Sequence, residues 1–200
     1  IYDNGSSNSW GSMHWGTGDC TGKMWGFGKW NGKLAVWGGC QDWITDLTVP
    51  VNDWTFISVT YDGEKLRAWI NETKDSTSMN ADYQTLTSDF FIGGETTNNG
   101  NSFRAFFKGK VDVVSIWGDA LTAAELSTVY NSGGNLDLLS NSGDYVSSAD
   151  LRGYWKFDAG SGSVLYDHTG KMNHGTINGA TWSDDVPITT PSSPGCTDPY

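Results

Sequence analysis

The chain has 200 residues, enough for one β-sandwich domain with a proper core, and its composition excludes several classes of partner. It contains 26 Gly and 11 Trp, and 12 Lys and Arg against 23 Asp and Glu give a net charge of −11. Many turn-forming and aromatic residues favour an all-β protein. The acidity argues against nucleic acids and anionic membrane surfaces. No apolar run approaches the ~20 residues needed to span a bilayer, so we expect no membrane insertion.

The cysteines and the shortage of basic residues predict a secreted or surface-displayed protein. Cys20 and Cys40 flank a predicted hairpin, so strand pairing can place them opposite one another. In an oxidising compartment such a pair forms a disulfide, and two free thiols are the alternative. Cys196 is left over in a tail rich in Pro and Ser.

Two hairpins stand out when the chain is taken in order. Residues 24–30 and 33–37 alternate aromatic and small residues around Asn31-Gly32, the pair typical of a type I′ turn. Residues 54–61 and 65–71 form a similar pair of strands around Asp-Gly-Glu. The connection between the hairpins, residues 41–51, is predicted to be a loop. Further short strands are expected near residues 10–15, 89–94, 153–158 and 176–182.

Residues 106–130 contain a strand and then the one helix that the sequence predicts. Val111–Trp117 is apolar on both sides, which predicts a strand covered on two faces. Thr122 and Glu125 then form a capping box, in which each side chain can bond the backbone amide of the other residue. We therefore expect a short helix near residues 122–131, ended by Asn-Ser-Gly-Gly.

This strand and helix carry a family resemblance. Gly109-Lys110-Val111-Asp112 and the segment from Ala120-Leu121-Thr122 through Glu125-Leu126 to Tyr130 resemble the closing part of laminin-G-like domains of the concanavalin A-like superfamily. Residues 54–71 extend the resemblance, and residues 153–182 do so more weakly. The resemblance implies an antiparallel β-sandwich, or jelly roll, of two sheets with one short helix. We place this domain at residues 1–186, followed at 187–200 by a linker and the start of a cysteine-containing repeat.

The order of the segments differs from that of most laminin-G-like domains. Segments similar to residues 153–182 come before the central hairpin in those domains, whereas here they come last. Circular permutation explains this order, because the first and last strands of a jelly roll are neighbours. Donation of residues 153–182 to a second copy of the chain is the alternative. The strands that precede the Ile1 region in the family are missing, so the domain is expected to be incomplete at its N-terminus or to borrow them.

No catalytic pattern is found, so the sequence predicts a protein that is not an enzyme. Glycosidases of the superfamily need two carboxylates on one strand face, in an E-x-D-x-E type of motif. The chain has four Glu residues, and none of them begins such a motif: Glu64, Glu72, Glu95 and Glu125. The three histidines are too scattered to predict a zinc site.

A calcium site is expected from the family resemblance. Asp167-x-Thr169-Gly170-x-x-Asn173 resembles the loop that precedes the second segment of laminin-G-like domains. Such a loop can aim the oxygens of Asp167 and Asn173 at one Ca²⁺ ion, with Asp112 approaching from the closing strand. The alternative is an Asx turn, in which Asp167 bonds its own backbone.

Carbohydrate binding is the leading functional hypothesis. Sugars are recognised by exposed aromatic faces with amide or carboxylate groups beside them, and Asp42, Trp43, Asn98 and Asn99 lie in predicted loops with this character. The alternative for each tryptophan is packing between the sheets. We therefore predict an adhesion module of a larger secreted or surface protein that binds glycans or cell-surface polysaccharide. Two other functions stay open: a structural subunit of an extracellular filament or particle that assembles by strand exchange between copies, and a degenerate glycoside hydrolase.

Overall fold

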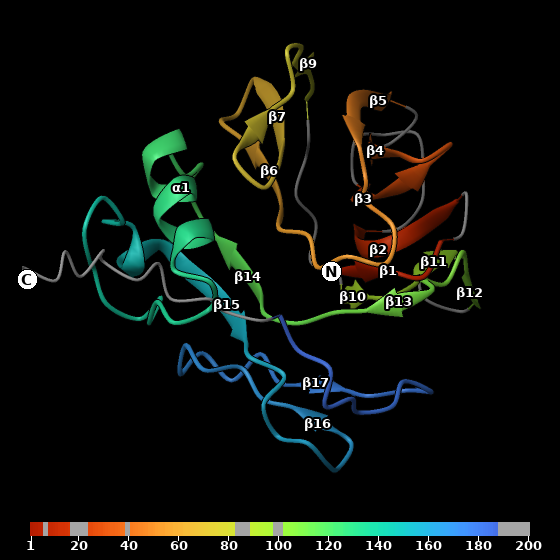
Figure 1. The fold of residues 1–200 in the computed structure, drawn as a ribbon, viewed down its shortest axis with the longest axis vertical. Coiled ribbons are helices and arrows are strands. Elements are labelled where there is room, and N and C mark those ends of the chain that lie inside the picture. The colour runs from red at the N-terminus through yellow and green to blue at the C-terminus, as the bar shows by residue number, and fades with distance from the viewer. Residues whose placement is uncertain (6–7, 17–23, 39–40, 83–88, 98–101, 188–200) are drawn as a thin grey trace, which may run out of the picture. The chain divides into compact units, whose positions relative to one another are not determined.

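A computed structural model describes residues 1–5, 8–16, 24–38, 41–82, 89–97 and 102–187 (Figure 1). Contacts between residues divide the chain into two units, Ile1–Val111 and Asp112–Tyr200, here called unit 1 and unit 2. The regular elements described in unit 1 are strands, whereas those described in unit 2 are short strands, an α-helix and a 3-10 turn. Within the described ranges, no helix is long and apolar enough to cross a membrane.

Unit 1 is built on a five-stranded antiparallel sheet. Its strands follow the order β10 (Phe90–Ile92), β2 (Ser9–Gly16), β3 (Met24–Trp30), β4 (Lys33–Gly38) and β5 (Gln41–Thr48). The predicted hairpin is confirmed, because β3 pairs with β4 across Asn31 and Gly32. Both turn residues have positive φ, 47° and 78°, as a type I′ turn requires.

A second antiparallel sheet of unit 1 contains the other predicted hairpin. Strand β7 (Lys65–Ile70) pairs with β6 (Ile57–Tyr61), with β8 (Thr73–Lys74) and with β9 (Met79–Asn80). Asn71, at φ 53°, turns the chain after β7, and its side-chain carbonyl accepts from the amide of Phe56 at 3.0 Å. The hairpin between residues 54 and 71 is therefore also confirmed.

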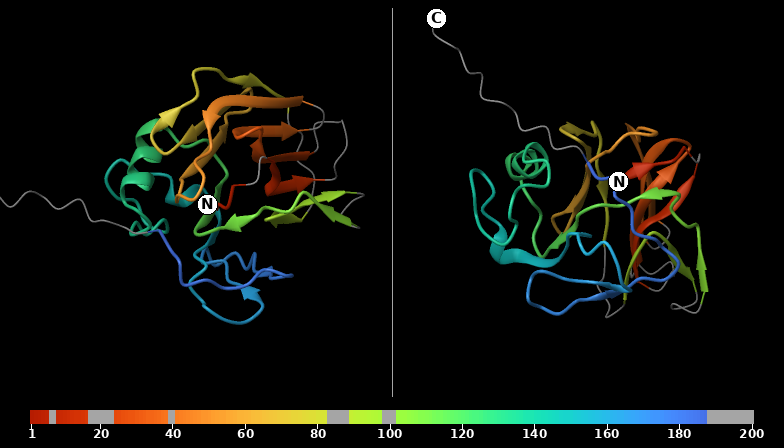
Figure 2. Two further views of the ribbon diagram at one scale, coloured as in Figure 1. Left: turned by 45° about the vertical axis from the view of Figure 1, so that its right-hand side comes forward. Right: turned by 60° about the horizontal axis from the view of Figure 1, so that its bottom comes forward.

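The two sheets of unit 1 face one another across a hydrophobic core (Figure 2). The five-stranded sheet contributes Phe27, Leu34, Val36, Trp43 and Leu47, and β7 contributes Leu66, Ala68 and Ile70. Each large apolar side chain removed from water in this way stabilises the fold by roughly 1.5–3 kcal/mol. The arrangement is that of a β-sandwich, as the sequence predicted.

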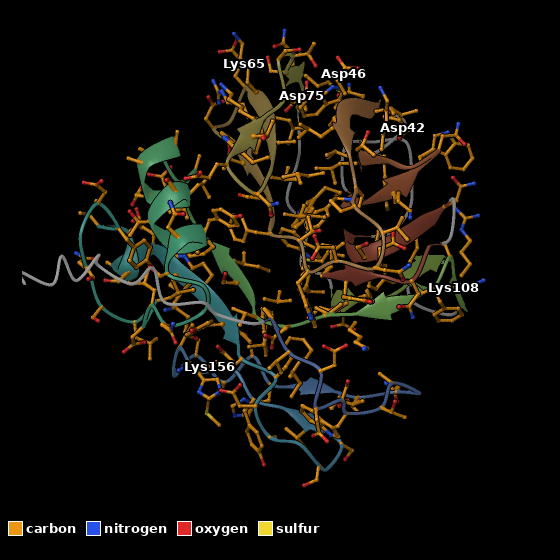
Figure 3. The ribbon with its side chains drawn as sticks, in the orientation of Figure 1. Asp42, Asp46, Lys65, Asp75, Lys108 and Lys156 are labelled. Atoms are coloured by element: carbon orange, nitrogen blue, oxygen red, sulfur yellow. The ribbon has the colours of Figure 1, made fainter. Side chains whose placement is uncertain are left out.

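The predicted loop at residues 41–51 is wrong, because most of it is strand β5. Burial alternates along β5, so Trp43, Thr45 and Leu47 face the core while Asp42 and Asp46 face outward (Figure 3). The outward-facing polar residues of β5 make its period-two pattern hard to recognise in the sequence, because Gln, Asp and Thr are also common in loops.

A buried ion pair links the N-terminal strand to the five-stranded sheet of unit 1. Strand β1 (Tyr2–Asp3) pairs with β13 (Gly109–Lys110), and the carboxylate of Asp3 contacts the ammonium group of Lys29 on β3. The side chains of Lys29 and Asp3 are only 3% and 1% exposed. Two further short strands, β11 (Glu95–Thr97) and β12 (Ser102–Arg104), form a hairpin with an ion pair between Glu95 and Arg104.

Unit 2 begins with a strand that is shorter than predicted. Strand β14 (Val114–Trp117) pairs antiparallel with β15 (Leu151–Trp155), and Val114 and Trp155 are both buried. The predicted strand over residues 111–117 is wrong for its first three residues. Val113 has φ 45°, a left-handed conformation outside the β region and unfavourable for a β-branched side chain.

The C-terminal segment pairs with the same chain in unit 2. Trp155 in β15 is buried, and its indole nitrogen donates to the carbonyl of Asn173 at 2.9 Å. The predicted last strand, residues 176–182, is shorter than expected: β17 covers Gly175–Thr176 and pairs with β16 (Val164–Leu165). The domain boundaries and the permuted order stay predictions, and residues 188–200, including Cys196, lie outside the described residues.

Helix α1 (Ala123–Asn131) starts at the predicted capping box. Thr122 accepts from the amide of Glu125 at 3.3 Å, and Glu125 accepts from the amide of Thr122 at 2.9 Å. The second oxygen of Glu125 accepts from the hydroxyl of Ser147 at 2.5 Å and the amide of Val146 at 3.3 Å. Glu125 therefore links the helix to the segment before the short 3-10 turn at Ser148–Asp150.

Removing one partner of the buried ion pair should cost far more stability than breaking an exposed pair. We expect Lys29→Met to lower the free energy of unfolding by about 3–5 kcal/mol, because it leaves the carboxylate of Asp3 buried without a cation. The matched control is Lys33→Met, since Lys33 pairs with Asp46 at 3.1 Å with side chains 41% and 70% exposed. That change should cost at most about 1 kcal/mol. Urea unfolding followed by tryptophan fluorescence measures both, and equal losses would contradict the prediction.

Glu125 should be the most important carboxylate for the stability of the helix. We expect Glu125→Ala to cost about 3 kcal/mol, because it removes a charged acceptor from several buried donors, whereas the exposed Asp144→Ala should stay within about 0.5 kcal/mol of the parent. Burial raises the pKa of Glu125, but hydrogen bonds from Ser147, Thr122 and Val146 outweigh it and lower the pKa below its usual 4.5. The contribution is thus present above pH 4.5 and is lost as the pH falls through the folded-state pKa. Urea unfolding at several pH values should show the difference between parent and variant shrinking in acid.

Candidate functional site

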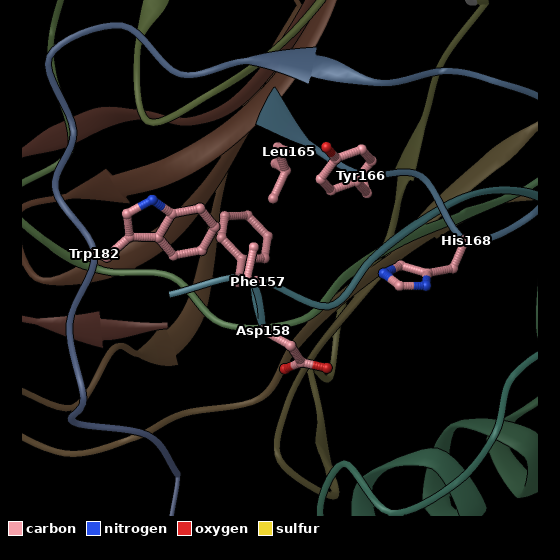
Figure 4. Close-up of a pocket in the computed structure, with 7 residues that line it drawn as sticks. Phe157, Asp158, Leu165, Tyr166, His168 and Trp182 are labelled. Atoms are coloured by element: carbon pink, nitrogen blue, oxygen red, sulfur yellow. The ribbon is translucent and has the colours of Figure 1, made fainter. Parts of the chain in front are cut away.

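A pocket of about 220 Å³ opens within unit 2 (Figure 4). Three short segments supply its walls: the chain that leaves β15, the chain around β16, and residue 182 near the end of the described chain. Aromatic side chains dominate the lining, and a carboxylate and an imidazole are the polar groups among them. The lining residues are Phe157, Asp158, Ala159, Leu165, Tyr166, His168 and Trp182.

An unusual backbone conformation places the first wall of the pocket. Phe157 has φ 62°, in the left-handed region that a bulky residue rarely adopts. Such a conformation costs on the order of 1–3 kcal/mol and persists only where the surrounding structure holds it. Figure 4 shows the result: the ring of Phe157 lies beside that of Trp182 and faces Leu165, with Asp158 next to it in the chain.

Hydrogen bonds and ring contacts hold the other walls. The indole nitrogen of Trp182 donates to the carbonyl of Gly162 at 2.9 Å, which fixes the edge of the ring. Tyr166 is 53% exposed and packs edge-to-face on His174, with ring centroids 5.4 Å apart. Leu165 is buried under them. The pocket therefore combines a fixed apolar lining with an aromatic side chain that is open to solvent.

The pocket lies in a negatively charged environment. Asp158 is exposed, and burial together with repulsion from Asp158 raises the pKa of the half-buried Asp112. Burial first, and then the charges of Asp137, Asp158 and other groups, raise the pKa of Tyr154 to about 12. Asp158 therefore contributes a negative charge to the wall of the pocket.

The predicted calcium loop has the geometry of an Asx turn. One oxygen of Asp167 accepts from the amides of Tyr154 and Thr169 at 3.1 and 3.0 Å. The other accepts from the amide of Asn173 at 3.0 Å and the hydroxyl of Thr169 at 2.8 Å. Burial raises the pKa of Asp167, but these hydrogen bonds outweigh it, and the pKa is lowered. Each oxygen of Asp167 therefore accepts at least two hydrogen bonds from the protein.

The other two predicted calcium ligands have different surroundings. The side-chain amide of Asn173 donates to the carbonyl of Arg152 at 3.0 Å, and Asp112 interacts with Asp158. Across the part of the chain that the structure describes, no three His, Cys, Asp or Glu residues are grouped so that they could hold a metal ion. The calcium site stays a prediction.

The structure describes two of the four residues predicted to bind a ligand, Asp42 and Trp43. Asp42 is exposed on β5, but Trp43 is only 9% exposed and packs in the core of unit 1, so it offers no open ring face. Asn98 and Asn99 lie outside the described residues, as do both members of the predicted disulfide, Cys20 and Cys40. Their roles stay predictions.

Sequence reasoning missed the pocket, although its residues had partial signals. Phe157-Asp158 and Tyr166-Asp167-His168 each combine an aromatic residue with polar neighbours, which is the composition expected of a sugar site. Trp182 follows 25 positions after Phe157, and nothing in that spacing indicates that the two rings meet. The left-handed conformation of Phe157 also has no sequence signal, because it depends on the surrounding packing.

The fold and a family model agree on the class of protein. Residues 2–127 match the model of a family described as the concanavalin A-like lectin/glucanases superfamily. The chain belongs to this family, and its antiparallel sheets and short helix are those of a jelly-roll β-sandwich. The comparison with curated proteins gives no significant match.

Solved structures include a similar protein from Bacteroides ovatus, described as a "putative carbohydrate binding protein". The similarity covers 94% of this chain with a TM-score of 0.65 and 22% identity. This chain spans about half of that protein, 53% of its length, and at such identity the similarity establishes the fold alone. An S-layer domain-containing protein from Clostridium thermocellum matches at 19% identity over 65% of this chain and 60% of that one, with a TM-score of 0.37, too low to support a shared fold.

The contacts of Asp167 predict a stability effect that does not depend on calcium. We expect Asp167→Asn to lower the free energy of unfolding by about 2 kcal/mol, because an amide cannot accept from all of these donors. Thermal unfolding with added CaCl₂ and with a chelator should give the same melting temperature for the parent protein, whereas a bound ion would raise it. Asp144→Asn is the control for the loss of one exposed charge. A rise in melting temperature with CaCl₂ that Asp167→Asn abolishes would instead establish the calcium site.

Proposed function

We propose that this chain is a carbohydrate-binding module that catalyses no reaction. The observation that carries the proposal is the pocket of unit 2, in which Phe157, Tyr166 and Trp182 stand beside Asp158 and His168. Sugar rings have apolar faces that pack on aromatic side chains, and their hydroxyl groups need a few well-placed hydrogen-bonding partners. This pocket offers both in a small volume.

The comparisons support the same class of ligand. The family description includes lectins, and the similar protein from Bacteroides ovatus is described as carbohydrate binding. The family also includes glucanases, so membership of the family does not by itself exclude catalysis.

The carboxylates of the chain support binding without hydrolysis. Glu95 is held by Arg104 at 3.0 Å, and Glu125 is buried in the capping box, so neither is available as an acid or a base. Asp112 and Asp158 interact, as the two carboxylates of a glycosidase do. However, Asp112 does not line the pocket, so the two groups do not flank a sugar bound there.

The proposal includes a setting outside the cell. Polysaccharides of cell surfaces are large and accessible only there, and the net charge of −11 suits a protein that stays soluble at high ionic strength. We propose that the chain acts as a module of a secreted or surface protein that attaches to glycans.

A glycan array followed by calorimetry tests the proposal. We expect Trp182→Ala and Tyr166→Ala each to weaken binding of the best glycan roughly tenfold, about 1.4 kcal/mol, because each removes an aromatic face. Phe106→Ala is the matched control, since Phe106 is also an exposed aromatic residue, at 60%, but belongs to unit 1. Circular dichroism checks that the variants fold.

Two results would contradict the proposal. Glycan binding that neither pocket variant weakens would exclude the pocket as the site. Release of reducing sugar from a bound glycan by the parent protein, lost in Asp158→Asn, would identify a hydrolase instead.

A further inference from the structure

We propose that the pocket of unit 2 selects glycans that carry protonated amino groups over neutral and acidic glycans. This inference rests on the proposed carbohydrate binding and adds the chemical class of the ligand. Three features of the pocket support it: a carboxylate at its wall without an ion-pair partner among the described residues, aromatic faces around it, and contacts that engage neighbouring Lys and Arg side chains elsewhere.

The carboxylate of Asp158 is the first feature. It lines the pocket and is exposed, and within the described ranges it forms no ion pair with Lys or Arg. An ammonium group of a ligand can donate to it in a charge-assisted hydrogen bond, which is roughly twice as strong as a neutral one. A hydroxyl group of a neutral sugar gains less from the same position, and a carboxylate of an acidic sugar is repelled.

The nearby cations are engaged elsewhere. Lys156 is two residues from Asp158 in the chain, but its ammonium group lies 5.2 Å from the ring centroid of Tyr154. Arg152 lies 3.9 Å from the carboxylate of Asp150. The whole of residues 112–200 contains eleven Asp and Glu but only three Lys and Arg, so the surroundings of the pocket add to its negative potential.

A second carboxylate strengthens the attraction for a cation. Asp112 is half-buried, and burial first and then the charge of Asp158 raise its pKa, so a positive group bound near Asp158 would reduce this repulsion. A neutral ligand leaves this repulsion unchanged. The two carboxylates together therefore attract a cation more strongly than Asp158 alone would.

The aromatic lining recognises the same group in a second way. Ammonium ions are attracted to the faces of Trp, Tyr and Phe, and one of each lines the pocket: Trp182, Tyr166 and Phe157. Aromatic faces also pack against the apolar side of the sugar ring. One ligand, an amino sugar, uses the carboxylate and the rings together.

Matched oligosaccharides test the inference. Tetramers of β-1,4-linked glucose, N-acetylglucosamine and glucosamine share one backbone and differ at a single ring carbon, so calorimetry compares the substituent alone. The measurements are made at a pH where NMR shows the amines of the free glucosamine tetramer to be protonated. We expect the glucosamine tetramer to bind at least about tenfold tighter than the glucose tetramer, with an affinity that falls as salt is added. An oligouronate should bind more weakly than either.

Variants separate the pocket from the general charge of the protein. Asp158→Asn should reduce the preference for glucosamine over glucose to about twofold or less, whereas Asp144→Asn, the same change at an exposed acid outside the pocket, should leave it intact. If both variants reduce it equally, the preference arises from net charge and the inference is overturned. Equal affinity of the parent for the glucose and glucosamine tetramers overturns the inference but leaves carbohydrate binding standing. Failure of the parent to bind any glycan overturns the proposed function as well.

Discussion

The buried carboxylate of Asp167 is the interaction on which the pocket depends. Its two oxygens accept from the backbone of Tyr154, in β15, and from Thr169 and Asn173 in the following loop. Its own amide donates to the imidazole of His174 at 3.0 Å, and His174 in turn packs against Tyr166. Because Tyr166 and His168 flank Asp167 in the chain, fixing this one residue fixes two walls of the pocket.

The sequence pattern of the loop from Asp167 to Asn173 is compatible with two different structures. Asp-x-Thr-Gly-x-x-Asn can gather oxygens around a cation or gather amides around a carboxylate, since a tight loop brings both kinds of group together. The choice depends on which backbone groups point inward. Here the amides of Thr169 and Asn173 donate to the carboxylate of Asp167, so this protein anion organises the loop.

The two units differ in how their charged side chains are paired, and this difference is relevant to ligand binding. In unit 1 the buried Lys29 pairs with the buried Asp3, and the buried Glu95 pairs with Arg104. Asp112 and Asp158 in unit 2 repel one another instead. The proposed ammonium ligand would pair with Asp158 and so reduce this repulsion.

The sequence by itself determined the features that depend on a few neighbouring residues. Asn31-Gly32 specifies its hairpin because both residues tolerate positive φ, and Thr122 with Glu125 specifies the start of α1 because the two side chains satisfy backbone amides within one turn. The family resemblance added the sandwich of two sheets. These signals are local or recur in a family, so they can be read without coordinates.

Only the tertiary structure decided which side chains meet. Trp43 faces the core because β5 pairs with β4, and Val113 leaves the strand although its sequence is fully compatible with one. The pocket joins Phe157 to Trp182 through the pairing of β16 with β17 and the contacts of Asp167. Contacts over such distances depend on strand register and on packing, because many arrangements satisfy the same local preferences and only the whole fold selects one.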